Sequence, residues 1–181
     1  MATRTRSARR YAEAAFSLAS EGNTLDRWGD DLAALAAFAE EGDVAPLLRS
    51  NRLPREEKLR LVEAGVGGQL SPLAMNLARL LAERGKLHLA REVEHAFREM
   101  LDDARGLAHA TVTTAVPLSG DERTAIAVRL SSMTGKQVDV TPVVDESIIG
   151  GLIARIGDQL IDGSTRTRLV ALKRRLETAS R

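Results

Sequence analysis

The sequence has no cysteine, and this absence removes several kinds of chemistry at once. Its 181 residues include one Trp, one Tyr, three Phe and three His. Without thiols the chain cannot form disulfides, thiolate metal sites or cysteine nucleophiles. So few aromatic side chains leave little material for the stacking platforms that bind single-stranded nucleic acids. The composition therefore favours a protein whose function uses neither cysteine chemistry nor base stacking.

An excess of charge and a long apolar run are also missing. The formal net charge is +1, whereas a general nucleic-acid-binding domain is usually clearly basic. The longest all-apolar stretch, "LAALAAFA" (32–39), is far shorter than the roughly 18 residues of a membrane span, so we expect no direct membrane insertion. The start, "MATRTRSARR", is as Arg-rich as a transit peptide. Because helical periodicity begins by residue 8, we expect a cytoplasmic protein that keeps this start.

The first hundred residues carry helical periodicity throughout. Apolar residues recur at three- and four-residue spacing, and glycines or caps separate the segments. Ser71-Pro72, for example, places a cap before a proline at the first helical position, where the missing N–H costs nothing. These patterns predict six helices near 8–21, 25–41, 43–50, 54–64, 72–84 and 87–101. Short connections between them are typical of a compact bundle.

The period changes near residue 107. Alternation in "LAHATVTTAVPL" (107–118) predicts a half-buried strand. Ser119 and Glu122 form a capping-box pattern that opens a helix ending at Gly135. "QVDVTPVV", "GLIARI" and "QLI" predict three further strands, and a last helix is expected from about Ser164. The fold class is therefore mainly α: six helices, then a smaller α+β domain of order β-α-β-β-β-α, with a boundary between 105 and 106.

Motifs for catalysis are weak. Gly135-Lys136 lacks the other elements of a phosphate-binding loop, and "GVGG" (65–68) is not a dinucleotide fingerprint. His95 shares a helical face with Glu92 and Glu99, but there is no HExxH zinc motif. Ser164 lies in no nucleophile elbow. We therefore expect no catalytic residue, no metal and no cofactor.

The stretch from 148 to 169, "IIGGLIARIGDQLIDGSTRTRL", gathers glycines, two aspartates and a serine. Gly157-Asp158 fits a hairpin turn, and Asp162 or Ser164 fits a helix cap. These residues are explained better as turns and caps of a small structural domain than as a catalytic site.

Charge is unevenly distributed along the chain. Residues 21–43 carry seven acidic residues against Arg27 alone, and 164–181 carry six bases against Glu177. Without a catalytic signal, this pattern favours a protein that binds charged partners. A helical adaptor with a nucleic-acid-binding tail stays an alternative, whose binding would weaken steeply with salt. An unrecognised hydrolase is a more distant alternative.

Three segments resemble one family. "VVDESIIGGLIARIGDQLIDGSTRTRL" (143–169) closely resembles the signature of the delta subunit of bacterial rotary ATP synthases, a family that includes the mitochondrial oligomycin-sensitivity-conferring protein. "RRYAEAAFSLA" (9–19) resembles the opening helix of that family, and "NLARLLAERGKL" (76–87) resembles its fifth helix. The resemblance spans the chain.

The resemblance implies a six-helix bundle over 1–105 that binds the catalytic head, and an α+β domain over 106–181 that binds the peripheral stalk. It implies a non-catalytic stator subunit that clamps the alpha/beta hexamer to the b-type stalk against rotor torque. Its partners would be the N-terminal segment of an alpha subunit and the C-terminus of a b-type subunit, with no nucleic acid. The implied location is the cytoplasmic face of the bacterial cell membrane, as a peripheral part of the complex.

The resemblance also implies sites. The alpha-subunit helix would lie between the first and fifth helices, although each candidate there also falls on a plausible core stripe. Those candidates are Ala8, Tyr11, Ala15, Asn76, Leu77 and Leu80. Candidate stalk contacts are Arg166, Arg168, Lys173 and Arg174. Signature residues expected to shape the fold are Asp145, Ser147, Gly150, Gly151, Gly157, Asp158, Asp162, Gly163 and Ser164.

Overall fold

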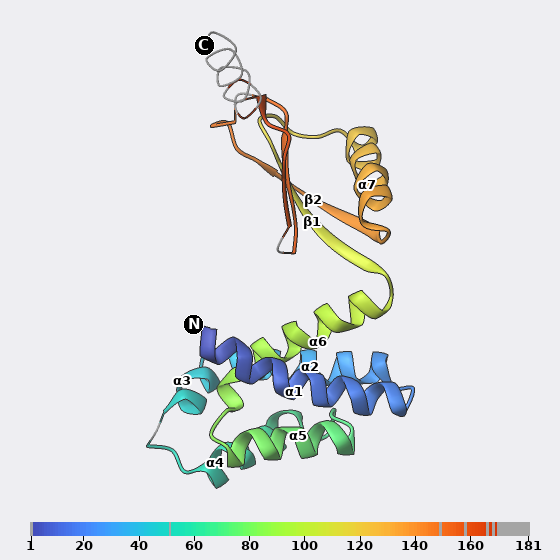
Figure 1. Cartoon of the computed structure of the whole chain (residues 1–181). Helices are drawn as coiled ribbons and strands as arrows, with labels where there is room; N and C mark the ends of the chain where they lie inside the picture. Colours follow the sequence, from blue (N-terminus) through green and yellow to red (C-terminus); the bar gives the residue numbers. More distant parts are fainter. Residues whose placement is uncertain are drawn as a thin grey trace, which may run out of the picture. The chain divides into compact units, whose positions relative to one another are not determined.

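The computed structural model describes residues 2–50, 52–148, 150–157, 159–165, 167 and 169, with the side chains of 2–5 left out. The chain divides into two compact units, Met1–Leu101 and Asp102–Arg181. Unit 1 is helical, and unit 2 contains a small sheet with a helix (Figure 1). The prediction of a mainly helical chain with a small sheet is confirmed.

Unit 1 is made of α-helices joined by short turns. Their bounds are α1 (Ala2–Glu21), α2 (Leu25–Glu40), α3 (Val44–Arg49), α4 (Arg55–Val66), α5 (Pro72–Glu83) and α6 (Ala90–Ala104), with a 3-10 turn, η1 (Leu87–Leu89), before α6. The first helix begins six residues earlier than its apolar periodicity indicated. Because α1 carries no acidic residue in its first turn and starts with polar residues, hydrophobic spacing alone missed that part.

The helix caps predicted at Ser71 and at Ser119 are both formed. The Ser71 hydroxyl accepts a hydrogen bond from the Ala74 N–H at the start of α5. Ser119 and Glu122 form the complete capping box. Thr24 occupies the N-cap position of α2 but its side chain makes no capping bond, because its hydroxyl points back to the Ala19 carbonyl.

The core of unit 1 combines alanines, which dominate on α1 and α5, with larger side chains such as Trp28 and Phe97. Phe16 and Phe97 meet edge to face, with ring centroids 5.8 Å apart. Trp28 is only 2% exposed, which places it inside this core and away from solvent. The α1 residues in the core are Ala8, Ala12, Ala15 and Ala19.

A buried carboxylate ties α2 to the start of α5. Asp31 is 2% exposed. Both of its carboxylate oxygens accept a hydrogen bond from the Ser71 backbone N–H, with a distance of 3.3 Å to the nitrogen. The Arg27 Nε lies 3.2 Å from Asp31 Oδ1 and neutralises its charge. A second Arg27 nitrogen donates to the Gln69 carbonyl at 2.6 Å. Since buried charge is tolerated only when paired and hydrogen-bonded, this network fixes the α4–α5 connection on α2.

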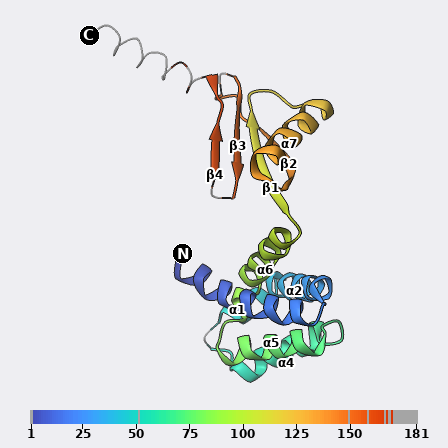
Figure 2. The same cartoon turned by 45° about the vertical axis from the view of Figure 1, so that its right-hand side comes forward.

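Unit 2 is a four-stranded sheet with α7 as the connection between its first two strands. The bounds are β1 (Leu107–Thr114), α7 (Gly120–Thr134), β2 (Gln137–Val144), β3 (Leu152–Ile156) and β4 (Gln159–Asp162). The strand order is β2-β1-β3-β4; β1 and β2 are parallel, and the other pairs are antiparallel (Figure 2). The predicted last helix lies mostly outside the described residues.

One face of the sheet packs on α7. Alternate strand residues, among them Val112, Val140 and Ala154, join Leu130 of α7 in a second small core. Pro142 lies in β2, which is an edge strand and therefore tolerates the missing N–H. The apolar residues of α7 are only partly buried: Leu130 is 4% exposed, whereas Met133 is 60% exposed.

No helix in the described part of the chain is long and apolar enough to cross a bilayer.

Removing the buried carboxylate should destabilise unit 1. Asp31→Ala leaves the Ser71 N–H and the Arg27 guanidinium without their acceptor, and such a loss costs about 1–3 kcal/mol. We expect the free energy of unfolding, measured by urea denaturation with circular dichroism, to fall by about 2 kcal/mol. Asp30→Ala, an exposed neighbour on the same helix, is the control and should stay within about 0.5 kcal/mol. Equal effects of the two substitutions would contradict this account.

Candidate partner-binding faces and the signature module

Helix α1 keeps its small side chains inside and a larger apolar residue outside. Its alanines at 8, 12, 15 and 19 are at most 2% exposed. Leu18, by contrast, is 49% exposed, and Tyr11 is half-buried against the edge of the core. The face of α1 through Tyr11, Ala14 and Leu18 therefore carries apolar surface that no described residue covers.

Helix α5 likewise has small side chains in the core and leucines on its exposed side. The core side is formed mainly by Ala74, Met75, Ala78, Leu81 and Ala82. Leu73 is 50% exposed, Leu80 is 38% exposed and Leu77 is half-buried. These three leucines follow one another at three- and four-residue spacing, so they lie on one side of the helix. Three of the four leucines of α5 thus face mostly outward, while three alanines, Met75 and Leu81 take the core positions.

The two exposed faces belong together because α1 and α5 lie side by side in both views (Figures 1 and 2). The helices run in opposite directions, since the Lys86 Nζ, just after α5, donates to the Ser7 Oγ near the start of α1 at 3.0 Å. This alignment brings the apolar residues of the two helices into one surface, which we call the α1–α5 strip. The strip consists of Tyr11, Ala14, Leu18, Leu73, Leu77 and Leu80.

The structure divides the six candidate contacts for the alpha subunit. Ala8 and Ala15 are 1% and 2% exposed and are core residues. Tyr11, Leu77 and Leu80 belong to the strip, and Asn76 is exposed beside it. Leu18 and Leu73, the two most exposed leucines of these helices, were absent from that set. Their periodicity is the same as that of core residues, so the sequence held no signal that separated them.

The signature stretch of unit 2 is a hydrogen-bonded turn. Asp162 Oδ1 accepts the Ser164 N–H at 2.9 Å, and Asp162 Oδ2 accepts the Thr167 hydroxyl at 2.7 Å. The Ser164 Oγ, which is buried, accepts the Thr167 N–H at 3.3 Å. The bonds from Ser164 and Thr167 hold the pKa of Asp162 below its usual value of 3.8. Both proposed capping residues thus act at the start of the following segment.

A second turn of the same kind precedes β3. Asp145 Oδ1 accepts the Ser147 N–H at 2.9 Å. Hydrogen bonds from the Ser147 side chain and backbone lower the pKa of Asp145. These bonds account for Asp145 and Ser147 as fold determinants.

At the signature glycines, the segment at the start of β3 passes close to the segment after β4, and we call this close approach the crossing. Gly163 N–H donates to the Leu152 carbonyl at 2.9 Å, and Thr165 N–H donates to the Gly150 carbonyl at 2.9 Å. Gly151 has φ +82, and a Cβ there would lie 2.5 Å from the Gly163 carbonyl oxygen. Only glycine fits this crossing without displacing backbone. Gly157 has φ +54 and leads into the β3–β4 connection, whereas Asp158 lies outside the described residues.

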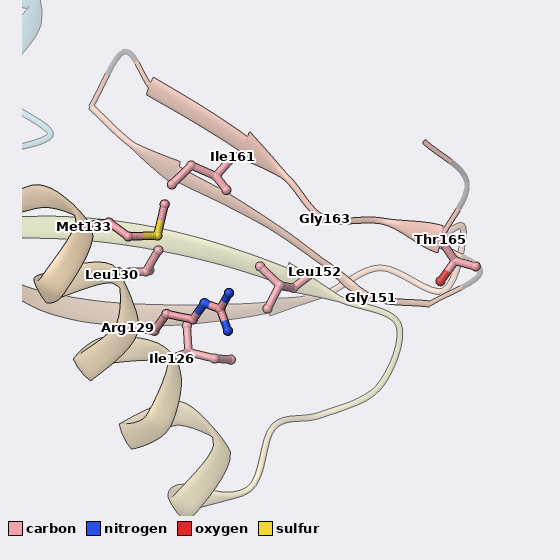
Figure 3. Close-up of a pocket in the computed structure, with 9 residues that line it drawn as sticks. All are labelled: Ile126, Arg129, Leu130, Met133, Gly151, Leu152, Ile161, Gly163 and Thr165. Carbon is pink, nitrogen blue, oxygen red and sulfur yellow. The ribbon is translucent and has the colours of Figure 1, made fainter. Parts of the chain in front are cut away.

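Residues of this segment line two hollows. The first, of about 420 Å³, is mainly apolar and lies between α7 and the β3–β4 hairpin (Figure 3). Its lining residues are Ile126, Arg129, Leu130, Met133, Gly151, Leu152, Ile161, Gly163 and Thr165. The second, of about 360 Å³, is more polar and is lined in part by Asp145, Ser147, Asp162, Ser164 and Thr167. The signature residues therefore shape both hollows.

The described residues contain no group of three or more metal-ligating side chains. His95 Nδ1 and Glu99 Oε1 lie 3.6 Å apart on the exposed face of α6, where both side chains are solvated. The four basic candidates for stalk binding, Arg166, Arg168, Lys173 and Arg174, lie outside the described residues. What the described geometry offers is apolar surface and shaped hollows, which suit the binding of other chains.

Together these features define a two-unit protein: a helical unit with an exposed apolar strip, followed by a small α+β unit. Residues 8–176 match the family model described as "ATP synthase delta (OSCP) subunit". The chain belongs to this family. It is thus a delta-type structural component of the ATP synthase peripheral stalk, distinct from the catalytic subunit.

Curated relatives agree over nearly the full length. "ATP synthase subunit delta" of Dehalococcoides mccartyi is 38% identical over 166 residues, 92% of this chain and 91% of the relative. The protein of the same name from Thioalkalivibrio sulfidiphilus is 38% identical over 169 residues, 93% of this chain and 95% of the relative. A chain of the Toxoplasma gondii mitochondrial ATP synthase hexamer is similar in fold, with a TM-score of 0.65 at 24% identity, covering 93% of this chain and 96% of that one.

The Asp162 turn should make unit 2 sensitive to acid. Because the folded pKa of Asp162 is lower than 3.8, its ionised form contributes stability above about pH 4 that is lost as the pH falls through the folded pKa. Wild type should therefore exceed Asp162→Ala in free energy of unfolding at neutral pH, and the gap should shrink below pH 3.8. Urea unfolding of both proteins across this pH range measures the gap. A gap that stays constant into acid would contradict a role for the ionised carboxylate.

Proposed function

We propose that the protein clamps the catalytic alpha/beta hexamer to the b-type stalk and so resists rotor torque during ATP synthesis. In this proposal residues 1–105 bind the head and residues 106–181 bind the stalk. The complex would place it at the cytoplasmic face of the bacterial cell membrane. Family membership supports the assignment to the stalk. The observation that carries the finer proposal is the α1–α5 strip, an apolar surface without a partner in the described chain.

The strip supports the docking of the N-terminal helical segment of the alpha subunit. Burying a leucine fully contributes about 1.5–3 kcal/mol, so Leu18, Leu73 and Leu80 leave a substantial part of this gain unused in the isolated chain. An amphipathic helix that packs its apolar face on the strip would recover this free energy, as in the helix-in-groove mode of peptide recognition. Tyr11 adds an aromatic surface with a polar tip at one end.

Unit 2 supports the second contact through different features. Its apolar hollow is flanked by exposed Met133, and Arg129 lies at its edge (Figure 3). An amphipathic stalk helix with carboxylate side chains would match both. The basic residues at 166, 168, 173 and 174 belong to the same proposal on sequence grounds.

Charge placed in the strip should abolish alpha-subunit binding. Leu77→Glu would bury a carboxylate under the docked helix, and we expect affinity for a peptide of the alpha-subunit N-terminal segment to fall at least about 100-fold, since an unpaired buried charge costs several kcal/mol. Isothermal titration calorimetry is suited to this measurement, because Trp28 is buried and is a poor reporter of the surface. Leu47→Glu, at an exposed leucine on α3, is the matched control. Comparable losses in both variants would argue against the strip.

The contribution of the hollow to stalk binding can be tested on one helix. Met133→Asp and Val128→Asp both replace exposed α7 residues, but only Met133 lines the hollow. We expect Met133→Asp to weaken binding of the soluble C-terminal segment of the b-type subunit by about 10-fold or more, as the loss of one buried side chain costs 1.5–3 kcal/mol. Val128→Asp should leave binding unchanged. Equal affinities for both variants would remove the hollow from the proposed interface.

A further inference from the structure

The two ends of the α1–α5 strip differ in charge. Arg10 precedes Tyr11, and Arg84 follows Leu80 by four residues, so that both exposed guanidiniums lie at the end where Lys86 meets Ser7. Neither arginine forms an ion pair with any described residue.

Other charges at this end leave it cationic. Arg6 is exposed one turn before Arg10 and is also unpaired among the described residues. Arg55 donates to the Glu83 carbonyl at 2.7 Å, which brings a further cation to the end of α5. Opposing them are the exposed carboxylate of Glu83 and that of Glu13, which pairs with Arg9. Cations therefore outnumber anions here.

The opposite end, at Leu18 and Leu73, carries no such excess. Glu21, the last residue of α1, is exposed three residues after Leu18 and accepts a bond from the Ser17 hydroxyl at 3.2 Å. Arg27 also reaches this end through Gln69, but the buried Asp31 neutralises it. The strip thus runs from a cationic end to a weakly anionic end.

We infer that the strip accepts a helix in one direction only, with the C-terminal turn of that helix, bearing carboxylates, at the Arg10–Arg84 end. This inference rests on the proposed docking at the strip and adds its polarity. A helix carries partial negative charge at its C-terminus and partial positive charge at its N-terminus, which match the two ends. Carboxylates in the last turn add ion pairs that help to fix register and direction.

The length of the strip sets the spacing of the anchors. Tyr11 and Leu18 are seven residues apart on α1, which corresponds to about 10 Å of helix. A docked helix therefore presents roughly two turns to the strip, with apolar anchors at positions i, i+4 and i+7. Its acidic residues follow within one turn of the last anchor.

Two designed peptides test the polarity. Both are capped amphipathic helices with the same apolar anchors; one carries two Glu in its last turn and two Lys in its first, and the other exchanges them. We expect the peptide with C-terminal Glu to bind the full chain about 5-fold or more tightly at low salt, since exposed pairs and helix-end charges each contribute modestly. The difference should shrink at 0.5 M salt through screening. Circular dichroism of the free peptides corrects for unequal helicity.

Variants of the protein separate polarity from docking. Arg10→Glu combined with Arg84→Glu should reverse the preference, whereas Arg49→Glu, an exposed arginine on α3, should not. A nitroxide on the C-terminus of the favoured peptide should broaden the amide signals near Arg10 and Arg84 and not those near Leu18 and Leu73.

Two results would overturn the inference. Equal affinity for the two peptides, with both lost in Leu77→Glu, would leave the strip as a docking face without direction. Failure of both peptides to bind the wild-type chain would remove the polarity and, with it, the strip as a general helix-docking surface.

Discussion

The use of alanine in the core of α1 and α5 is the constraint on which unit 1 depends. Because Ala8, Ala12, Ala15 and Ala19 face inward, most of the core positions of α1 are small, and Phe16 adds one ring against Phe97. The bulk of the core comes instead from residues such as Trp28 and Phe97. Several larger apolar residues of these two helices, Leu18, Leu73 and Leu80, are left exposed. An interior built in this way produces an apolar exterior on the same helices.

Such an arrangement fits a subunit that functions inside an assembly. A monomeric protein would gain by turning the leucines inward, and exposed contiguous apolar surface usually marks an interaction site. The buried Asp31 network holds the start of α5 on α2, which keeps the leucine face in position. In unit 2 the signature turn also fixes the position of one segment against another. Its carboxylates and glycines hold β3 and the segment after β4 at a distance that only glycine permits.

Much of this architecture could be predicted from the sequence, because caps, glycine stops and the change of period at residue 107 are local signals. The capping box at Ser119 and the cap at Ser71 are examples. Side-chain placement within one apolar stripe was harder to predict. Leu73 and Leu81 both satisfy helical periodicity, yet one is 50% exposed and the other is fully buried. Which of them faces the core depends on the neighbouring helices, and no single-helix pattern contains that information.

The signature stretch illustrates the opposite case. Its residues are few, polar and close in sequence, so their hydrogen bonds are local and their structural role could be inferred before the fold was known. The two hollows could not be foreseen, since they arise where α7, β3 and the turn after β4 meet in space.

The most direct test of the clamp is whether one chain holds both partners at once. Sedimentation velocity of the full chain with a carrier-fused alpha-subunit N-terminal segment and the soluble b-type fragment would measure this. The account predicts a single complex containing all three, from which Leu77→Glu releases the alpha segment and leaves the b-type fragment bound. Mutually exclusive binding of the two partners, or loss of both in Leu77→Glu with the fold intact, would contradict it.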